Sequence, residues 1–140
     1  MPPGAGFSQR LIRRYTQVVF HERRIGRAAG FFAPDVTWRG STGPALRGRD
    51  RVIALIGDVV GALDGLTATE QDMAAHGDTV TVRYRIEATH SRDLFGVPAS
   101  GRPIRWAPAS TYHIADGKIV NAVTSGNLAS ILRGDDLGPP

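Results

Sequence analysis

The sequence predicts an α+β protein whose helices come first and whose antiparallel strands follow. Apolar residues recur at three- and four-residue steps in the first half, as they do on one face of a helix. From Thr79 to Glu87, apolar and polar residues alternate, which is typical of a strand with one buried face. The pair Asp116-Gly117 is a hairpin signal between two further strand-like segments.

The first half of the chain carries helical patterns. The first predicted helix runs from Phe7 to about Arg24, with apolar residues on one face and arginines on the other. A shorter helical stretch, about Ile25 to Phe32, ends before Pro34, because proline cannot continue a helix. A loop rich in glycine and proline is predicted over residues 40–48, and Asp50 can then cap a predicted third helix with a broad apolar face.

The second half changes to the two-residue period of strands. The turn Gly77-Asp78 precedes the strand that begins at Thr79. A loop rich in glycine, proline and serine separates it from a second strand, Ile104 to Ile114. After the hairpin turn, a third strand returns from Lys118 to Thr124, and a short helix follows. Helices followed by antiparallel strands indicate an α+β domain.

Length and composition favour one domain over residues 1–140, with mobile ends at residues 1–6 and 134–140. The chain is 41% hydrophobic and 21% charged, which is ordinary for a protein with one packed core. Cysteine is absent, so disulfides and thiolate chemistry are excluded. The 4 histidines are scattered without metal-binding spacing, and no nucleotide-binding glycine motif occurs. We therefore expect no metal and no other cofactor.

The net charge of +4 comes with arginines clustered near the start of the chain. They could form a basic stripe, but no nucleic-acid-binding motif accompanies them. We expect a solvated helix face and no nucleic-acid partner. The first residues contain no apolar run long enough for a signal peptide or membrane span, so we expect a cytoplasmic protein with no membrane partner. The clustered residues are Arg10, Arg13, Arg14, Arg23, Arg24 and Arg27.

Segments along most of the chain resemble the SnoaL-like polyketide cyclases, a branch of the nuclear transport factor 2-like superfamily. The segments are FFAPDVTW (31–38), ATHSRDLFGVPASGRPI (88–104) and YHIADGKIVNAV (112–123). The resemblance implies a cone-shaped half-barrel, in which a curved antiparallel or mixed sheet wraps around the N-terminal helices. It also implies a cavity open at one end, a homodimer, and catalysis without a cofactor.

The sequence departs from this family at the catalytic positions. In the aldol-type cyclases, the acid/base is an aspartate on the last strand, with a histidine two residues before it. Carried across the match at Gly117-Lys118-Ile119, these two positions are Thr124 and Ala122. A threonine hydroxyl does not ionise near neutral pH and cannot take or give the proton in that way. The family's cyclase mechanism therefore does not transfer directly.

Strand alternation predicts which side chains line the cavity. If Ala122 and Thr124 face it, Val120 does too, and the neighbouring strand presents its even-numbered residues from Trp106 to Tyr112. Such a small, apolar and aromatic wall suits a flat polyketide-like molecule. The alternative is that the tryptophans and Tyr112 belong to the core or to a dimer interface. The predicted substrate-binding residues are Tyr15, Trp38, Trp106, Ser110, Tyr112, Asn121 and Thr124.

The candidate catalytic residues lie on the long strand and the loop after it. Arg85 and Glu87 stand two residues apart and share a face, and they are similar to the Arg-x-Asp pair of epoxide hydrolase relatives. The alternative is an exposed ion pair. His90 and Asp93 are expected near the cavity mouth, where a histidine could move a proton near neutral pH. The alternative for His90 is a structural hydrogen bond. His113 is expected to point outward.

The resemblance implies a tailoring enzyme of polyketide, antibiotic or other secondary-metabolite biosynthesis. It would act on a small apolar substrate as a cyclase-type or hydroxylase-type enzyme, without the usual aspartate. Two alternatives stay open. One is a non-catalytic domain that binds a small molecule. The other is an epoxide-opening hydrolase or cyclase that uses Glu87 and Arg85.

Overall fold

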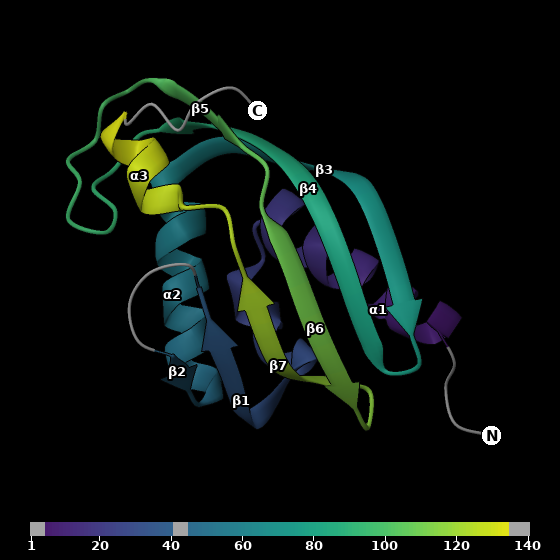
Figure 1. Ribbon diagram of the computed structural model, residues 1–140. Helices are drawn as coiled ribbons and strands as arrows, with labels where there is room; N and C mark the ends of the chain where they lie inside the picture. Colours follow the sequence, from purple (N-terminus) through teal and green to yellow (C-terminus); the bar gives the residue numbers. More distant parts are fainter. Residues whose placement is uncertain (1–4, 41–44, 135–140) are drawn as a thin grey trace.

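Helices and a curved, unclosed sheet make up the protein in a computed structural model that describes residues 5–40 and 45–134 (Figure 1). The α+β class and the curved mixed sheet predicted from the sequence are confirmed. The strands are β1 (Phe32–Arg39), β2 (Leu46–Arg47), β3 (Leu63–His76), β4 (Thr79–His90), β5 (Pro103–Trp106), β6 (Ala109–Ala115) and β7 (Lys118–Thr124).

The sheet has the strand order β2-β1-β7-β6-β4-β3, and β5 pairs with β4 beside this path. Strands β1 and β7 run parallel, whereas the other pairs are antiparallel. Strand β4 contacts three partners, since β3 lies along one edge and β5 and β6 share the other. It therefore holds the middle of the long, curved part of the sheet (Figure 1).

The N-terminal helix is less regular than its sequence predicts. Helix α1 (Ala5–Thr16) continues as a π-helical segment, Gln17–His21, and the chain then turns at Arg23, whose φ is 58°. The prediction of one regular helix to about Arg24 is corrected accordingly. A π-helical turn holds more residues than an α-helical turn, so it shifts which side chains share a face. The other helices are a 3₁₀-helix (Ile25–Phe31), α2 (Arg49–Ala62) and α3 (Leu128–Arg133).

Strand β3 was not predicted from the sequence. Its residues are mostly exposed, and Leu63 and Leu66 are the buried anchors at its start. It lacks the regular apolar alternation of a strand, and its register against β4 shifts twice. The strand forms because β4 offers a long edge of backbone hydrogen-bonding groups beside it.

The single strand predicted from Ile104 to Ile114 is two strands. The ladder breaks at Pro108, which has no N–H to donate. The carbonyl oxygen of Pro108 instead accepts a hydrogen bond from the backbone N–H of Tyr84 at 3.0 Å. A second irregularity lies between β6 and β7, where the register shifts after His113. This shift buries Ile119 and leaves Val120 half-buried, so the prediction that Val120 faces inward is wrong.

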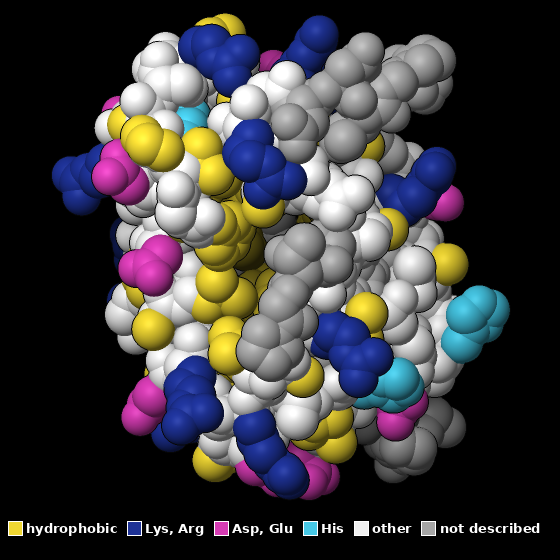
Figure 2. All heavy atoms as spheres, turned by 60° about the vertical axis from the view of Figure 1, so that its left-hand side comes forward, with side chains coloured by type: hydrophobic (Ala, Val, Ile, Leu, Met, Phe, Trp, Pro, Cys, Tyr) yellow, Lys and Arg dark blue, Asp and Glu magenta, His cyan; other side chains and the backbone are white. Residues whose placement is uncertain are grey.

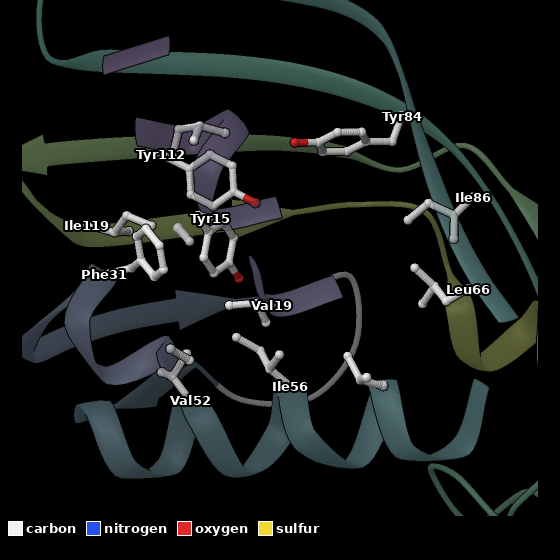
Figure 3. Close-up of a cluster of buried hydrophobic side chains, with 14 of the residues drawn as sticks. Tyr15, Val19, Phe31, Val52, Ile56, Leu66, Tyr84, Ile86, Tyr112 and Ile119 are labelled. Carbon is white, nitrogen blue, oxygen red and sulfur yellow. The ribbon is translucent and has the colours of Figure 1, made fainter. Parts of the chain in front are cut away.

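The core lies between the concave face of the sheet and the helices, with Tyr15 among its fully buried side chains (Figure 3). Its ring makes edge contacts with Phe20, Phe31, Phe32 and Tyr112 at centroid distances of 5.5–6.0 Å. Such edge-to-face contacts add to the burial of apolar area. They fix the end of α1 against the sheet.

The predicted mobile ends fall largely outside the described residues. Of the residues predicted to be mobile, the structure describes Ala5 and Gly6, which begin α1, and Gly134, which follows α3 with a φ of 79°. The mobility of residues 1–6 and 134–140 and the single-domain boundary therefore stay predictions. His113 is exposed, as strand alternation predicts.

Replacing Ile119 by alanine should lower the free energy of unfolding by about 2–5 kcal/mol, because the side chain is fully buried where the ladder shifts. Denaturant unfolding followed by circular dichroism measures this change. The matched control is Val123→Ala on the same strand, where the side chain is 44% exposed. It should change stability by no more than about 0.5 kcal/mol. Equal effects at the two positions would contradict the buried bulge.

Candidate functional site

A cavity of about 450 Å³ lies between the curved sheet and helix α2. Figure 2 shows hydrophobic side chains gathered around a hollow on the face that carries its mouth. Leu55, Ile56 and Val59 of α2 form one wall. The strands form the opposite wall, and the cavity is also lined by Leu128 and Ala129 of α3 and by Phe95 of the loop between β4 and β5. The volume is within the range of small-molecule pockets.

Strand β4 contributes Tyr84 and Ile86 to the cavity, and its alternation sends Arg85 and Glu87 to the other face. The Arg85 and Glu87 side chains are 59% and 50% exposed, and Arg85 Nε lies 3.8 Å from Glu87 Oε1. The two residues do share a face, but that face is outside. The structure thus favours the alternative of an exposed ion pair, because neither group reaches the cavity.

His90 and Asp93 also lie away from the cavity wall. His90 is fully buried, and its Nδ1 lies 3.3 Å from the hydroxyl oxygen of Ser100. Asp93 accepts a hydrogen bond from the backbone N–H of Ala99 at 2.9 Å. Both contacts hold the loop between β4 and β5 in place. This placement favours the structural alternative for His90 and does not bring the two groups together in the pocket.

Five of the predicted substrate-binding residues line the cavity: Trp38, Trp106, Ser110, Tyr112 and Thr124. Tyr15 does not line it, because its ring is enclosed by the aromatic core. Asn121 does not line it either. It accepts a hydrogen bond from the Thr37 hydroxyl at 2.6 Å, across the pairing of β1 with β7.

Sequence reasoning missed Thr16, Phe20, Tyr84 and Phe95, which also line the cavity. The signal for Tyr84 was present, since it belongs to the apolar register of β4. Thr16 and Phe20 are four residues apart at the change from α-helix to π-helix, which no sequence pattern indicated. Phe95 lies on the loop after β4 with a left-handed φ of 53°, and it is 47% exposed.

Two hydroxyl pairs supply polar groups to the apolar wall. The Thr16 and Tyr84 hydroxyl oxygens lie 2.7 Å apart, and so do those of Ser110 and Thr124. The Thr124 hydroxyl also donates to the backbone carbonyl of Ala109 at 3.4 Å. Among the described residues that line the cavity, none carries a formal charge. The wall can therefore donate and accept hydrogen bonds but offers no ionised acid or base.

Burial keeps the cavity tyrosines protonated. It raises the pKa of Tyr84, and the hydrogen bond with Thr16 opposes this rise only in part. Burial likewise raises the pKa of Tyr112, with the Ser110 hydroxyl opposing it. Behind them, burial raises the pKa of Tyr15 well above its ordinary value. Each phenol is a neutral hydrogen-bond donor at neutral pH.

The Trp106 side of the wall is held by close packing with Gly126. This glycine has a φ of 122°, and a Cβ atom there would lie 3.1 Å from Trp106 Cδ1 and 3.0 Å from Pro108 Cβ. A larger residue would meet the strain of the positive φ together with these tight contacts. The indole or the Pro108 ring would have to move by a few tenths of an ångström to admit it.

Within residues 5–40 and 45–134, no group of three or more histidine, aspartate or glutamate side chains could hold a metal ion. The same residues contain no helix long and apolar enough to cross a membrane.

A family model described as a SnoaL-like domain matches residues 12–122. No curated protein matches the sequence. A candidate SnoaL-like polyketide cyclase from Jannaschia sp. CCS1 has a TM-score of 0.82 at 17% identity, covering 99% of this chain and 98% of that one. AclR, a candidate hydroxylase from Streptomyces galilaeus, has a TM-score of 0.79 at 20% identity, covering 96% and 86%. An LEH-like epoxide hydrolase from M. tuberculosis has a TM-score of 0.72 at 12% identity, covering 94% and 91%. At these identities the likeness is one of fold.

Stability should fall at alkaline pH, because all 3 tyrosines are buried with raised pKa values. Below about pH 10 the phenols are protonated in both states, so their contribution is constant. Above that pH the unfolded chain releases protons that the folded chain retains, which favours unfolding. Tyrosinate absorbance should therefore rise together with the loss of circular dichroism. A rise in tyrosinate near pH 10 in a folded protein would contradict the burial.

Proposed function

Because this chain belongs to the SnoaL-like family, we propose that it is a tailoring enzyme of polyketide or other secondary-metabolite biosynthesis, binding a flat apolar substrate in its cavity. The observation that carries the proposal is the cavity of about 450 Å³, whose described wall is apolar and aromatic with a few neutral hydroxyls. Such a wall favours rings and ketones over charged metabolites, since a charge would lose its hydration without gaining a partner.

A cyclase-type ring closure fits a cavity without an ionised base. In a chain of alternating ketones, an enol carbon attacks a second ketone carbon. A carbon–carbon bond forms, and the enol proton passes to the oxygen of the attacked ketone. No oxidant, metal or external base is consumed. Holding the two carbons in a reactive orientation can lower such a barrier by up to about 7–11 kcal/mol.

The hydroxyl pairs would assist this closure by hydrogen bonding. Negative charge develops on the attacked oxygen, and fixed neutral donors in a low-dielectric site stabilise it. Thr124 occupies the position of the aspartate that the resemblance leads one to expect, and its hydroxyl is paired with Ser110 at 2.7 Å. We therefore assign this pair to substrate positioning rather than to proton abstraction.

A hydroxylase-type reaction is the second candidate, favoured by the structural likeness to AclR. It would require an oxidant and a partner oxidoreductase, whereas ring closure needs neither. A non-catalytic binding domain is the third candidate, because the acid/base pair is absent at Ala122 and Thr124. Epoxide opening by Glu87 and Arg85 is not proposed, since both side chains lie on the outer face.

Two further expectations remain part of the proposal: that the protein acts in the cytoplasm, which rests on the sequence pattern at its start, and that it is a homodimer, which the resemblance implies. Sedimentation velocity of the full chain distinguishes a dimer from a monomer.

Filling the cavity should abolish binding of a flat aromatic ligand. Ala68 of β3 lines the cavity, and Ala68→Phe places a ring inside it. Titration with acetylnaphthalene, followed by tryptophan fluorescence, should show quenching in the native protein, because Trp38 and Trp106 line the same space. The variant should lose at least about 90% of the affinity, a cost of about 1.4 kcal/mol or more. The matched control is Ala74→Phe on the exposed face of the same strand, which should bind normally. Unchanged binding by Ala68→Phe would contradict the assignment of the cavity.

Turnover separates the enzyme from the binding domain. A linear polyketone thioester incubated with the protein should give one ring product faster than in buffer, as followed by chromatography and mass spectrometry. Ala68→Phe should remove the acceleration, and Ala74→Phe should retain it. Tight binding with no change in the rate or distribution of products would favour the non-catalytic domain.

A further inference from the structure

We propose that the Thr16–Tyr84 hydroxyl pair is the site at which the cavity holds a carbonyl oxygen of its ligand. This inference rests on the proposed function, since it places a ketone within the same cavity. Thr16 comes from the end of α1 and Tyr84 from the centre of β4, and both line the cavity. The inference makes the predicted ligand class more specific: the ligand is an apolar molecule that carries a ketone at a defined position.

The pair has one hydrogen more than it can use. Each hydroxyl carries a single hydrogen, and the 2.7 Å contact between the two oxygens takes one of them. The second hydrogen has no further acceptor among the described residues. Whichever oxygen donates within the pair, the other hydroxyl keeps a free hydrogen. An uncommitted donor on an apolar wall favours a ligand acceptor.

Thr16 is committed to this pair rather than to its own helix. A threonine within a helix often donates to the carbonyl oxygen four residues earlier. Thr16 instead contacts Tyr84, and the π-helical segment begins directly after it. Segments of π-helix occur frequently at functional sites. Thr16 and Phe20, four residues apart, both line the cavity, so a polar contact lies beside an aromatic one.

The second hydroxyl pair differs in this respect. Between Ser110 and Thr124 one hydrogen is shared, and the Thr124 hydroxyl has the Ala109 carbonyl oxygen at 3.4 Å as a further acceptor. That pair is satisfied within the protein. The Thr16–Tyr84 pair is therefore the better hydrogen-bond donor. The two hydroxyl pairs of the cavity wall differ in whether they have a hydrogen available for the ligand. A ligand with a single carbonyl should place it beside Thr16 and Tyr84 in preference to the Ser110–Thr124 pair.

The test compares two ligands of one shape. Acetylnaphthalene carries a carbonyl oxygen where isopropenylnaphthalene carries a methylene group. The native protein should bind the ketone more tightly by about three- to tenfold, the range expected for one net hydrogen bond. In Tyr84→Phe and Thr16→Val this preference should vanish, so that the two ligands bind with equal affinity. Thr16→Ser keeps a hydroxyl and should restore the preference.

A matched control lies on the outer face of β4 and β6. The Thr81 and Thr111 hydroxyl oxygens lie 3.2 Å apart, and both side chains point away from the cavity. Thr81→Val removes a hydroxyl of the same kind and should leave the preference intact. The infrared carbonyl band of bound acetylnaphthalene gives a second readout, which a change in folding would not imitate. It should move to lower frequency in the native protein and return in Tyr84→Phe.

The possible outcomes separate this inference from the proposed function. Equal binding of both ligands by the native protein would overturn the inference and leave the apolar cavity standing. A preference that survives Tyr84→Phe but disappears in Ser110→Ala would overturn it as well, by moving the carbonyl to the other pair. If neither ligand binds, the proposed function fails and the inference fails with it.

Discussion

The two-residue alternation of β4 is the constraint on which both faces of the sheet depend. This strand pairs with β3, β5 and β6, so its register fixes theirs. Its inward side chains, from Val80 to Ala88, are buried, and the outward ones between them are exposed. A shift by one residue would turn Arg83, Arg85 and Glu87 into the core, where burying the unpaired Arg83 would be costly. Because this shift is costly, β4 keeps the register that points Tyr84 and Ile86 into the cavity.

The described residues that line the cavity carry no formal charge, and four of their hydroxyls contact one another in two pairs. A hydroxyl in apolar surroundings is costly unless it has a partner, and strand pairing supplies one for Ser110 from Thr124 on β7. The helix supplies Thr16 for Tyr84. Recognition in such a cavity depends on shape and hydrogen-bond direction. The charged side chains of β4 lie on the outer face, where solvent screens them.

Local patterns in the sequence were enough to predict the fold class, and together with the family resemblance they predicted much of the cavity wall. The alternation around Ser110 and Tyr112, carried to the neighbouring strand, placed both residues and Thr124 correctly. It also predicted that Arg85 and Glu87 share a face, but the period alone does not say which face is inside. The apolar neighbours Tyr84 and Ile86 held that information, because burial selects them.

Other features depend on contacts distant in sequence, which local patterns do not contain. Strand β3 forms against the edge of β4 although its own residues lack a strand pattern. The bulge that buries Ile119 in place of Val120 arises from the pairing of β6 with β7. Thr16 lies at the end of α1 and contacts the Tyr84 hydroxyl of β4, a partner 68 residues away along the chain. Strand alternation therefore predicts which face a side chain lies on only within a stretch that contains no bulge or break.

The packing of Gly126 against Trp106 indicates which parts of the cavity can diversify over evolutionary time. Any side chain at position 126 would press on the indole and on Pro108, and the backbone there takes a conformation that suits glycine. Backbone geometry therefore fixes this wall, and we expect few substitutions to be tolerated at position 126. The opposite wall consists of side chains from one helix, such as Leu55 and Val59, which can be exchanged without moving the main chain. New substrate sizes in descendants of this chain should arise by substitutions along α2.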